Sequence, residues 1–385
     1  MQYNKNDRHK GYNRYNAGEW SGAFGDLGTL IPFIAGYIAV LGMNPAGILV
    51  TTGFFMIAAG LHFKTPFPVQ PMKAIGATAI AQGGVVSANM IWGAGLFTGL
   101  FWLVLGLTGA LAWVSKIAGK PLIRGITLGL GFSFIIQSMD FMQNDVLVAA
   151  IAFIMTFILL NYKKIPVMIV LLAFGFAVSM FTNPDFSQEL SAIGIEPTLP
   201  VFALSGLTFR DMLTGIFILA LPQIPLTLGN AVIATTAENN RLFPERKVSE
   251  KRVAIFKGIM NLTTPIFGGI PLCNGAGGMA AHTRFGAKTG GAVIIMGCTL
   301  LIMGLFFGSS VLIIFAGIPA GILGVILFFA GLELAMSARD VSFNKGDSYI
   351  LLITAGFSLW NPGIGFLAGL VVQELVKRLS HLQTH

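Results

Sequence analysis

Residues 68–73 read Pro-Val-Gln-Pro-Met-Lys, and residues 271–278 read Pro-Leu-Cys-Asn-Gly-Ala-Gly-Gly. Each stretch interrupts an apolar run and opens a segment, 69–83 or 272–283, that is too short to cross a bilayer as a full helix. Prolines suit the first turn of a helix, and glycines let a ligand approach the backbone closely. Both stretches therefore predict a short helix that begins within apolar surroundings.

The composition around these stretches is that of a membrane protein. Of 385 residues, 55% are hydrophobic and only 10% are charged, and the mean hydropathy is +0.78. Soluble domains carry about 25% charged residues. A soluble globular protein, a disordered chain and a nucleic-acid binder are therefore excluded, although the net charge is +8. The 48 glycines and 17 prolines favour broken helices, the two cysteines indicate no disulfide framework, and no signal peptide is visible.

Apolar runs between helix breakers define fourteen predicted segments. They lie near 18–41, 45–61, 69–83, 88–114, 121–138, 145–160, 165–181, 212–236, 253–268, 272–283, 288–307, 309–336, 347–360 and 363–379. With both termini cytoplasmic, 22 of the 24 lysines and arginines fall on the cytoplasmic side. The exceptions are Arg210, on the outer side, and Lys73, inside the third segment. The sequence thus predicts a multi-pass protein of the cell (inner) membrane, and the lipid bilayer as its surroundings.

The fourteen segments divide into two halves of seven, and an odd number per half gives the halves opposite orientations. The helix breaks recur at matching places, since Asp26 to Pro71 spans 45 residues and so does Leu228 to Cys273. The polar stretch 182–211 is the predicted seam. We predict an all-α polytopic fold, a seven-plus-seven inverted repeat with half-helices in segments three and ten.

Two short helices that begin in mid-membrane would direct free amide groups and positive dipole ends into one cavity, which favours an anion. The alternative is that the glycines only permit tight helix packing. Neutral amide side chains accompany the breaks and suit a tetrahedral oxyanion, whose oxygens accept many N–H bonds. They are Gln70, Gln223, Asn230 and Asn274.

Ionisable residues inside predicted spans need a partner or a purpose. Lys73 could be a counter-charge for an anion, could pair with Asp26, or could extend to the inner membrane rim. Asp26 could cap exposed backbone amides, hold Lys73, or take up a proton when the anion arrives. Thr29 could contribute a hydroxyl or bond its own helix, and Glu333 is predicted to be structural or gate-related. Neither a phosphate-binding loop nor zinc-ligand spacing is present, so we predict no enzyme, metal site or cofactor.

The motifs at these breaks resemble those of the molybdate transporter family, a branch of the sulfate permease superfamily. The similarity runs in order over nearly the whole chain. It rests on residues 24–32, 68–74, 221–227 and 271–280 and on the basic turn 284–288.

The resemblance implies the fold shared by sulfate and uracil permeases, in which a transport core slides against a gate like an elevator, with substrate between segments three and ten. It implies a cytoplasmic tail at 1–17, core parts at 18–117 and 212–307, and gate parts at 118–211 and 308–385. Two features depart from the family pattern. Most sulfate permeases carry a C-terminal cytosolic STAS domain, which we do not expect here, and Asn274 stands where family members often have histidine.

The resulting prediction is a secondary active transporter of a tetrahedral oxyanion. Molybdate is the first choice of substrate and sulfate the second, and protons are a possible coupling ion. A homodimer is implied by the resemblance alone. The predicted substrate contacts are Gln70, Met72, Lys73, Gln223, Cys273, Asn274, Gly275, Ala276 and Gly277. The predicted coupling or structural residues are Asp26, Thr29, Asn230 and Glu333. A passive anion channel of the same fold remains an alternative. A nucleobase permease ranks last, because it would need a carboxylate in segment eight or ten, and Glu238 lies only near the cytoplasmic end of segment eight.

Overall fold

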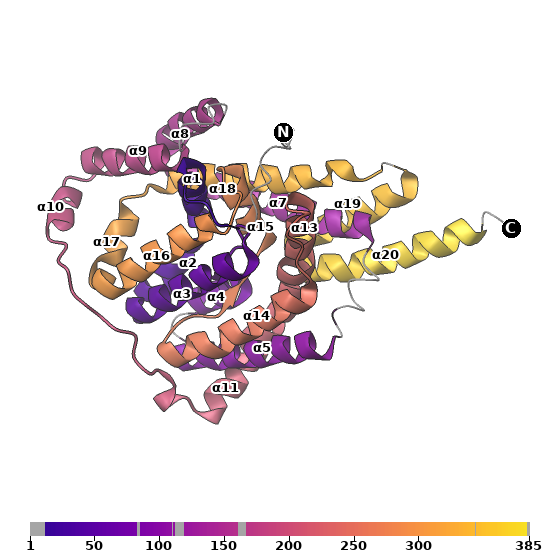
Figure 1. Ribbon diagram of the computed structural model, residues 1–385, viewed down its shortest axis with the longest axis horizontal. Coiled ribbons are helices and arrows are strands. Elements are labelled where there is room, and N and C mark those ends of the chain that lie inside the picture. The colour runs from indigo at the N-terminus through magenta and orange to yellow at the C-terminus, as the bar shows by residue number, and fades with distance from the viewer. Residues whose placement is uncertain are drawn as a thin grey trace.

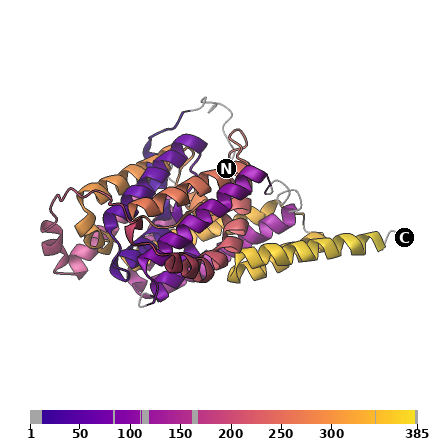
Figure 2. The same ribbon diagram turned by 90° about the horizontal axis from the view of Figure 1, so that it is seen from below.

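A computed structural model describes residues 12–82, 85–109, 111, 119–160, 167–342 and 344–382. Its regular structure is almost entirely helical, and the long C-terminal helix extends away from the body of the molecule (Figures 1 and 2). The first half of the chain contains α1 (Ala17–Ala23), η1 (Phe24–Asp26), α2 (Leu27–Ala39), α3 (Pro45–Phe63), β1 (Gln70–Pro71), α4 (Lys73–Ala81), α5 (Ala88–Thr108), α7 (Lys120–Gln143), α8 (Val146–Leu159), α9 (Val167–Thr182) and α10 (Phe186–Ser191).

The second half follows a similar order of helices around a second short strand. It contains η2 (Leu204–Gly206), α11 (Phe209–Gly215), η3 (Ile216–Ala220), α12 (Leu221–Leu226), η4 (Thr227–Ala234), α13 (Thr235–Leu242), α14 (Glu250–Thr263), η5 (Thr264–Phe267), β2 (Leu272–Cys273), α15 (Ala276–Arg284), α16 (Gly291–Phe306), η6 (Gly308–Ser310), α17 (Val311–Ala316), α18 (Ala320–Ala335), η7 (Met336–Asp340), α19 (Lys345–Trp360) and α20 (Pro362–Leu382).

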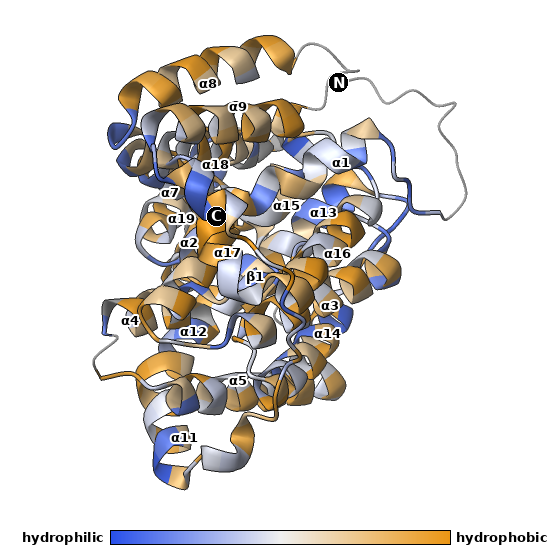
Figure 3. Cartoon of the chain, turned by 90° about the vertical axis from the view of Figure 1, so that its left-hand side faces the viewer, coloured by the Kyte–Doolittle hydropathy of each residue, from blue (hydrophilic) through white to orange (hydrophobic). Residues whose placement is uncertain are grey.

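Several of these helices have the length and hydropathy of membrane spans. Among the described residues, four helices qualify by themselves, and the number rises to six if each of two bent pairs is taken as one span. The fourteen predicted segments include shorter apolar helices, such as α8 and α9, that fall below this length. Most residues of α8 and α9 are apolar (Figure 3), and Leu147 on α8 is 74% exposed. Such a surface suits contact with lipid.

Helices of the first half pack mainly on helices of the second. The most extensive pairings join α3 to α16, α5 to α14, and α7 to α18. Glycines permit this closeness, as a Cβ on Gly53 would lie 2.5 Å from the carbonyl oxygen of Gly297 on the facing helix. Gly131 and Gly331 meet in the same way between α7 and α18. Small residues at such contacts are typical of membrane helices, whose backbones approach closely.

The eighth predicted segment is an irregular helix. Its run from α11 to α13 includes two π-helical stretches, η3 and η4, on either side of α12. Pro222 and Pro225 lie in α12 and lack the amide hydrogen that an α-helix needs, so the regular ladder of hydrogen bonds is interrupted here. The break turns polar side chains of this segment toward the short helices α4 and α15.

A strand pair joins the two halves at the centre of the fold. β1 and β2 run antiparallel, with Gln70 opposite Cys273 and Pro71 opposite Leu272. The outer edge of β2 is occupied by Asn261 of α14, whose side chain exchanges two hydrogen bonds of 2.8 Å with the Leu272 backbone. An all-α prediction omitted these two-residue strands, because their prolines read only as helix breakers.

Candidate functional site

The strand pair brings the beginnings of two short helices together. β1 ends at Pro71, and α4 begins two residues later at Lys73. In the same way, α15 begins at Ala276, three residues after the end of β2. The Met72 amide extends the pairing by donating to the Pro271 carbonyl oxygen at 2.9 Å. Free amides and partial positive charge collect at the first turn of a helix, so the arrangement concentrates both at one place.

Two side chains of the eighth segment accept hydrogen bonds from these first turns. The Gln223 side-chain oxygen accepts from the Ala74 amide at 2.8 Å and the Ile75 amide at 3.3 Å. In the same way, the Asn230 oxygen accepts from the Ala276 amide at 3.0 Å. One carboxamide therefore caps each short helix, a capping role that the sequence did not reveal.

One amide at the start of each short helix remains unused. Within the described part of the chain, the backbone N–H groups of Lys73 and Gly277 have no hydrogen-bond acceptor. One belongs to each half of the protein. A ligand that accepts hydrogen bonds on several sides would satisfy both, and anions at helix starts gain most from such donors.

Lys73 and Gly277 share a neighbour, Phe134 of α7. The Lys73 ammonium lies 3.9 Å from the centroid of the Phe134 ring, and a Cβ on Gly277 would lie 2.3 Å from the edge of the same ring. Among the described residues, no carboxylate lies within 4.0 Å of the Lys73 ammonium, so the proposed ion pair with Asp26 is wrong. Sequence reasoning missed Phe134, since a phenylalanine in an apolar run reads as core.

Asp26 is buried in a network of side chains. Both carboxylate oxygens accept from the Gln70 side-chain nitrogen, at 2.7 and 2.6 Å, and one also accepts from the Thr29 hydroxyl. The expectation that Asp26 caps backbone amides is wrong, because its partners are side chains. The Gln70 oxygen faces α15, where a Cβ on Gly275 would lie 2.5 Å from it. Gly275 therefore permits the two short helices to approach.

Three other predicted contacts also line this junction. The Asn274 side-chain nitrogen donates to the Pro68 carbonyl oxygen at 2.8 Å, while its buried oxygen has no partner among the described residues. Met72 is fully buried and Cys273 is 6% exposed, so neither presents much surface.

Glu333 lies apart from the helix starts. It faces Arg284, the last residue of α15, at 3.6 Å. This ion pair joins α15 to α18, which agrees with the structural alternative for Glu333.

Lys257 of α14 is a site residue that the charge count assigned to a cytoplasmic loop, and that assignment was wrong. Its side chain is fully buried, and its ammonium lies 3.5 Å from the Cys273 sulfur. The sequence did carry a signal, because Lys257 falls inside the predicted apolar segment 253–268.

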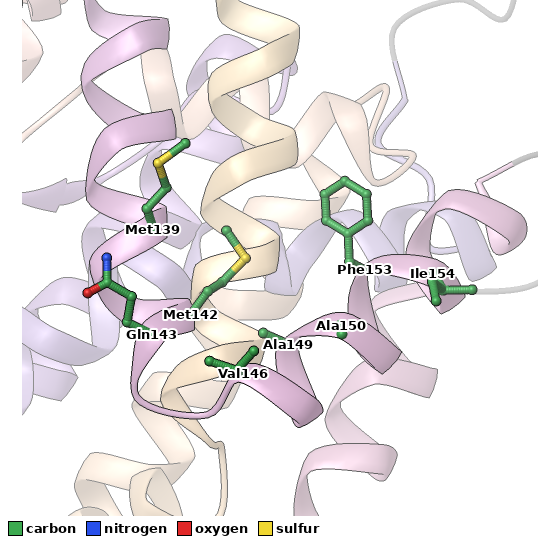
Figure 4. A pocket seen from close by; sticks show the side chains of 8 residues that line it. All are labelled: Met139, Met142, Gln143, Val146, Ala149, Ala150, Phe153 and Ile154. Atoms are coloured by element: carbon green, nitrogen blue, oxygen red, sulfur yellow. The ribbon is translucent and has the colours of Figure 1, made fainter.

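An apolar cavity lies elsewhere, between α7 and α8. It has a volume of about 560 Å³, and Figure 4 shows Met139, Met142 and Phe153 among its lining side chains. Its only polar lining side chain is Gln143. A cavity without cationic side chains does not suit an anion, so the junction of β1 and β2 is the better candidate site.

The fold is that of known anion transporters. It resembles the transmembrane domain of the cyanobacterial bicarbonate transporter BicA, with a TM-score of 0.58, 16% identity, and coverage of 91% of this chain and 96% of that one. It also resembles the murine anion transporter Slc26a9 in its inward-facing state, with a TM-score of 0.62, 12% identity, and coverage of 96% and 69%.

Sequence comparison places the chain more narrowly. The profile of the family described as "Molybdate transporter of MFS superfamily" matches residues 18–134 and 215–334. Molybdate transporter 2 of Arabidopsis thaliana is 33% identical, with coverage of 93% of this chain and 87% of the relative. Molybdate transporter 1 of Chlamydomonas reinhardtii is 27% identical, with 92% and 90% covered. The chain belongs to the molybdate transporter family and is a multi-pass integral membrane protein, so the resemblance stated from the motifs is confirmed.

Proposed function

We propose that this protein is a secondary active transporter of a tetrahedral oxyanion, molybdate first and sulfate second. The observation that carries the proposal is the pair of unused amides, Lys73 and Gly277, one at the start of each short helix. Phe134 lies beside both the Lys73 ammonium and Gly277. Relatives described as molybdate transporters support the choice of substrate. An oxyanion with four acceptor oxygens matches donors that approach from two helices.

The proposed contacts are the two amides and the Lys73 ammonium, with Asn274, Cys273, Gly275 and Ala276 forming the wall around them. Gln223 and Asn230 would act through the backbone amides that they cap, and Gln70 would act through its hydrogen bonds to Asp26. Met72 would contribute packing only. Phe134 would cover the bound ion, since its ring contacts both helix starts.

The proposed architecture is fourteen segments in a seven-plus-seven inverted repeat, with both termini cytoplasmic in the cell membrane. An exchange of partners supports it. Under the repeat, segment two corresponds to segment nine, and segment four corresponds to segment eleven. The packing of α3 on α16 (segments two and eleven) is therefore the counterpart of the packing of α14 on α5 (segments nine and four). The matched blocks 18–134 and 215–334 also fall one in each half.

The proposed mechanism is alternating access in which the core moves like an elevator against the gate. Lys73 and Gly277 belong to the core and Phe134 to the gate, so movement between them would uncover the anion. Asp26 is the proposed proton carrier, because it is a buried carboxylate hydrogen-bonded to Gln70 of β1, the strand that precedes α4. A homodimer is part of the proposal and rests on the family resemblance.

The test is uptake of labelled molybdate into liposomes that contain the purified protein, with excess sulfate or excess uracil as competitor. The Lys73→Gln protein is measured beside it, and Lys345→Gln serves as the matched control because Lys345 is an exposed lysine at the start of α19, outside the strand pair and both short helices. We expect accumulation that sulfate reduces and uracil does not, and its loss only in Lys73→Gln.

Three other results of the uptake assay would change the assigned function or substrate. Uptake that follows voltage without accumulation would identify a channel. Indifference to sulfate would define a molybdate-selective pocket. Absence of both molybdate and sulfate flux in the unmodified protein would refute the oxyanion assignment.

A further inference from the structure

Lys257 is a buried cation that no carboxylate of the described residues accompanies. Its side chain is fully buried within α14, where it also lies 5.7 Å from the centroid of the Trp102 ring. An ammonium has three hydrogens to donate, and its one recorded hydrogen bond is to the Cys273 sulfur, a weak acceptor. Within the described part of the chain, no carboxylate lies within 4.0 Å of it.

Such an arrangement is costly unless a negative charge arrives. A charged lysine within a bilayer is unfavourable on insertion scales, and buried charges are normally paired. The neighbouring Arg124 and Arg241 illustrate the usual solution, because both face the buried carboxylate of Glu238. Lys257 lies about two turns into α14, the next helix along the chain, and no carboxylate among the described residues pairs with it as Glu238 pairs with the arginines.

Its position ties Lys257 to the anion site. Cys273 belongs to β2 and stands opposite Gln70 in the strand pair. One turn along α14 from Lys257, Asn261 holds the same strand through Leu272. Lys73 follows β1 by two residues, and β1 pairs with the strand that holds Cys273. The two lysines therefore flank one residue of the junction, one from each half of the chain.

We propose that Lys257 is the second fixed positive charge of the anion site and gives it a preference for doubly charged oxyanions over singly charged ones. Lys257 does not touch the ion, since it is fully buried behind Cys273, and it acts as a positioning residue through its field. Two lysines balance the two charges of a molybdate or sulfate ion. The Coulomb energy of a fixed charge with a dianion is twice that with a monoanion, which is the source of the preference. The proposal rests on the proposed transport of an oxyanion.

The first arm of the test measures molybdate uptake by Lys257→Gln and Lys257→Arg, with nitrate and sulfate as competitors. Lys251→Gln is the matched control, because Lys251 is an exposed lysine of the same helix. We expect the KM for molybdate to rise about tenfold or more in Lys257→Gln, with nitrate becoming a relatively stronger competitor. Lys257→Arg should retain the native preference, and Lys251→Gln should behave as the unmodified protein. An unchanged KM and unchanged competition in Lys257→Gln would overturn the proposal.

The second arm needs no Lys257 variant. Cys273 and Cys298 are the only cysteines, so Cys298→Ser leaves Cys273 as the single thiol. The reaction rate of Cys273 is measured with an anionic, sulfonate-bearing methanethiosulfonate and with the neutral methyl methanethiosulfonate. Each rate is divided by the rate of the same reagent with free mercaptoethanol, which corrects for intrinsic reactivity. We expect the anionic reagent to be favoured and molybdate to slow both reactions. No advantage for the anionic reagent, or no reaction at all, would refute a positive, water-accessible pocket.

The two arms separate the failure of this inference from that of the proposed function. If the unmodified protein moves neither molybdate nor sulfate but the anionic reagent is favoured, the positive pocket stands and the transport assignment fails. If molybdate is transported but its KM and the competition are unchanged in Lys257→Gln, the inference alone is wrong.

Discussion

Replacing Gly277 with alanine tests whether Phe134 closes over the two helix starts. An added Cβ would lie 2.3 and 2.4 Å from two carbons of the Phe134 ring, whereas carbon atoms pack at about 3.5–4.0 Å. The ring or the helix must therefore move by more than about 1 Å. Overpacking of this kind costs about 1–3 kcal/mol. Displacing the ring also removes it from beneath the Lys73 ammonium, a contact of about 0.5–2 kcal/mol.

The assay measures thermal unfolding of the purified protein and its KM for molybdate. We expect Gly277→Ala to lower the free energy of unfolding by about 1–3 kcal/mol and to raise the KM. The double variant Gly277→Ala with Phe134→Leu should recover part of both losses, because leucine lacks the ring edge that collides. Gly356→Ala is the control, since a Cβ there meets nothing within 4 Å. It should be neutral, or stabilise by about 0.5–1 kcal/mol as in ordinary helices.

The result that would refute this reasoning is a Gly277→Ala protein as stable as the unmodified one with the same KM. A loss that Phe134→Leu does not reduce would place the collision elsewhere and remove Phe134 from the site.

Three further substitutions test other parts of the arrangement. Asp26→Asn keeps the size of the side chain but removes the carboxylate that would carry a proton. Uptake driven by a pH difference should therefore be lost, while exchange of bound molybdate persists. Accumulation that still follows the pH difference would remove the proton from the mechanism. Asn261→Ala leaves the buried N–H and carbonyl of Leu272 without partners, which should cost about 1–3 kcal/mol of unfolding free energy; an unaltered melting temperature would show that β2 needs no support from α14. Glu238→Gln removes the carboxylate that faces Arg124, and breaking a buried pair typically costs about 3–5 kcal/mol; unchanged stability in detergent would mean that this pair contributes little.

Part of this site could be predicted from the sequence because breaks in apolar segments are local signals. The prolines and glycines at 68–73 and 271–278 marked both short helices and the junction between them. The family followed from the same motifs. The candidate list also named Gln223 and Asn230, although as an anion contact and a coupling residue.

The remaining features depend on contacts between distant segments and leave no local pattern. Phe134 lies more than 50 residues from either helix start in the chain, and nothing in its own segment distinguishes it from a core phenylalanine. Gln223 and Asn230 cap helices only because the π-helical turns of their segment rotate them inward. Lys257 was misplaced because basic residues near a loop were counted by sequence position, whereas burial depends on how α14 packs against α5.

The pairing of β1 with β2 has a consequence for biosynthesis. Its two strands are separated by about 200 residues, so the first cannot meet its partner until most of the chain has left the ribosome. At about 5–20 residues per second, α4 waits on the order of ten to forty seconds after synthesis before β2 is made. Its opening turn is uncapped for most of that time, since Gln223 is also made later. During that interval the first half is an incomplete intermediate within the membrane. Quality-control proteases and insertion chaperones would meet this intermediate, and truncations before residue 273 should be degraded even when every earlier span has inserted.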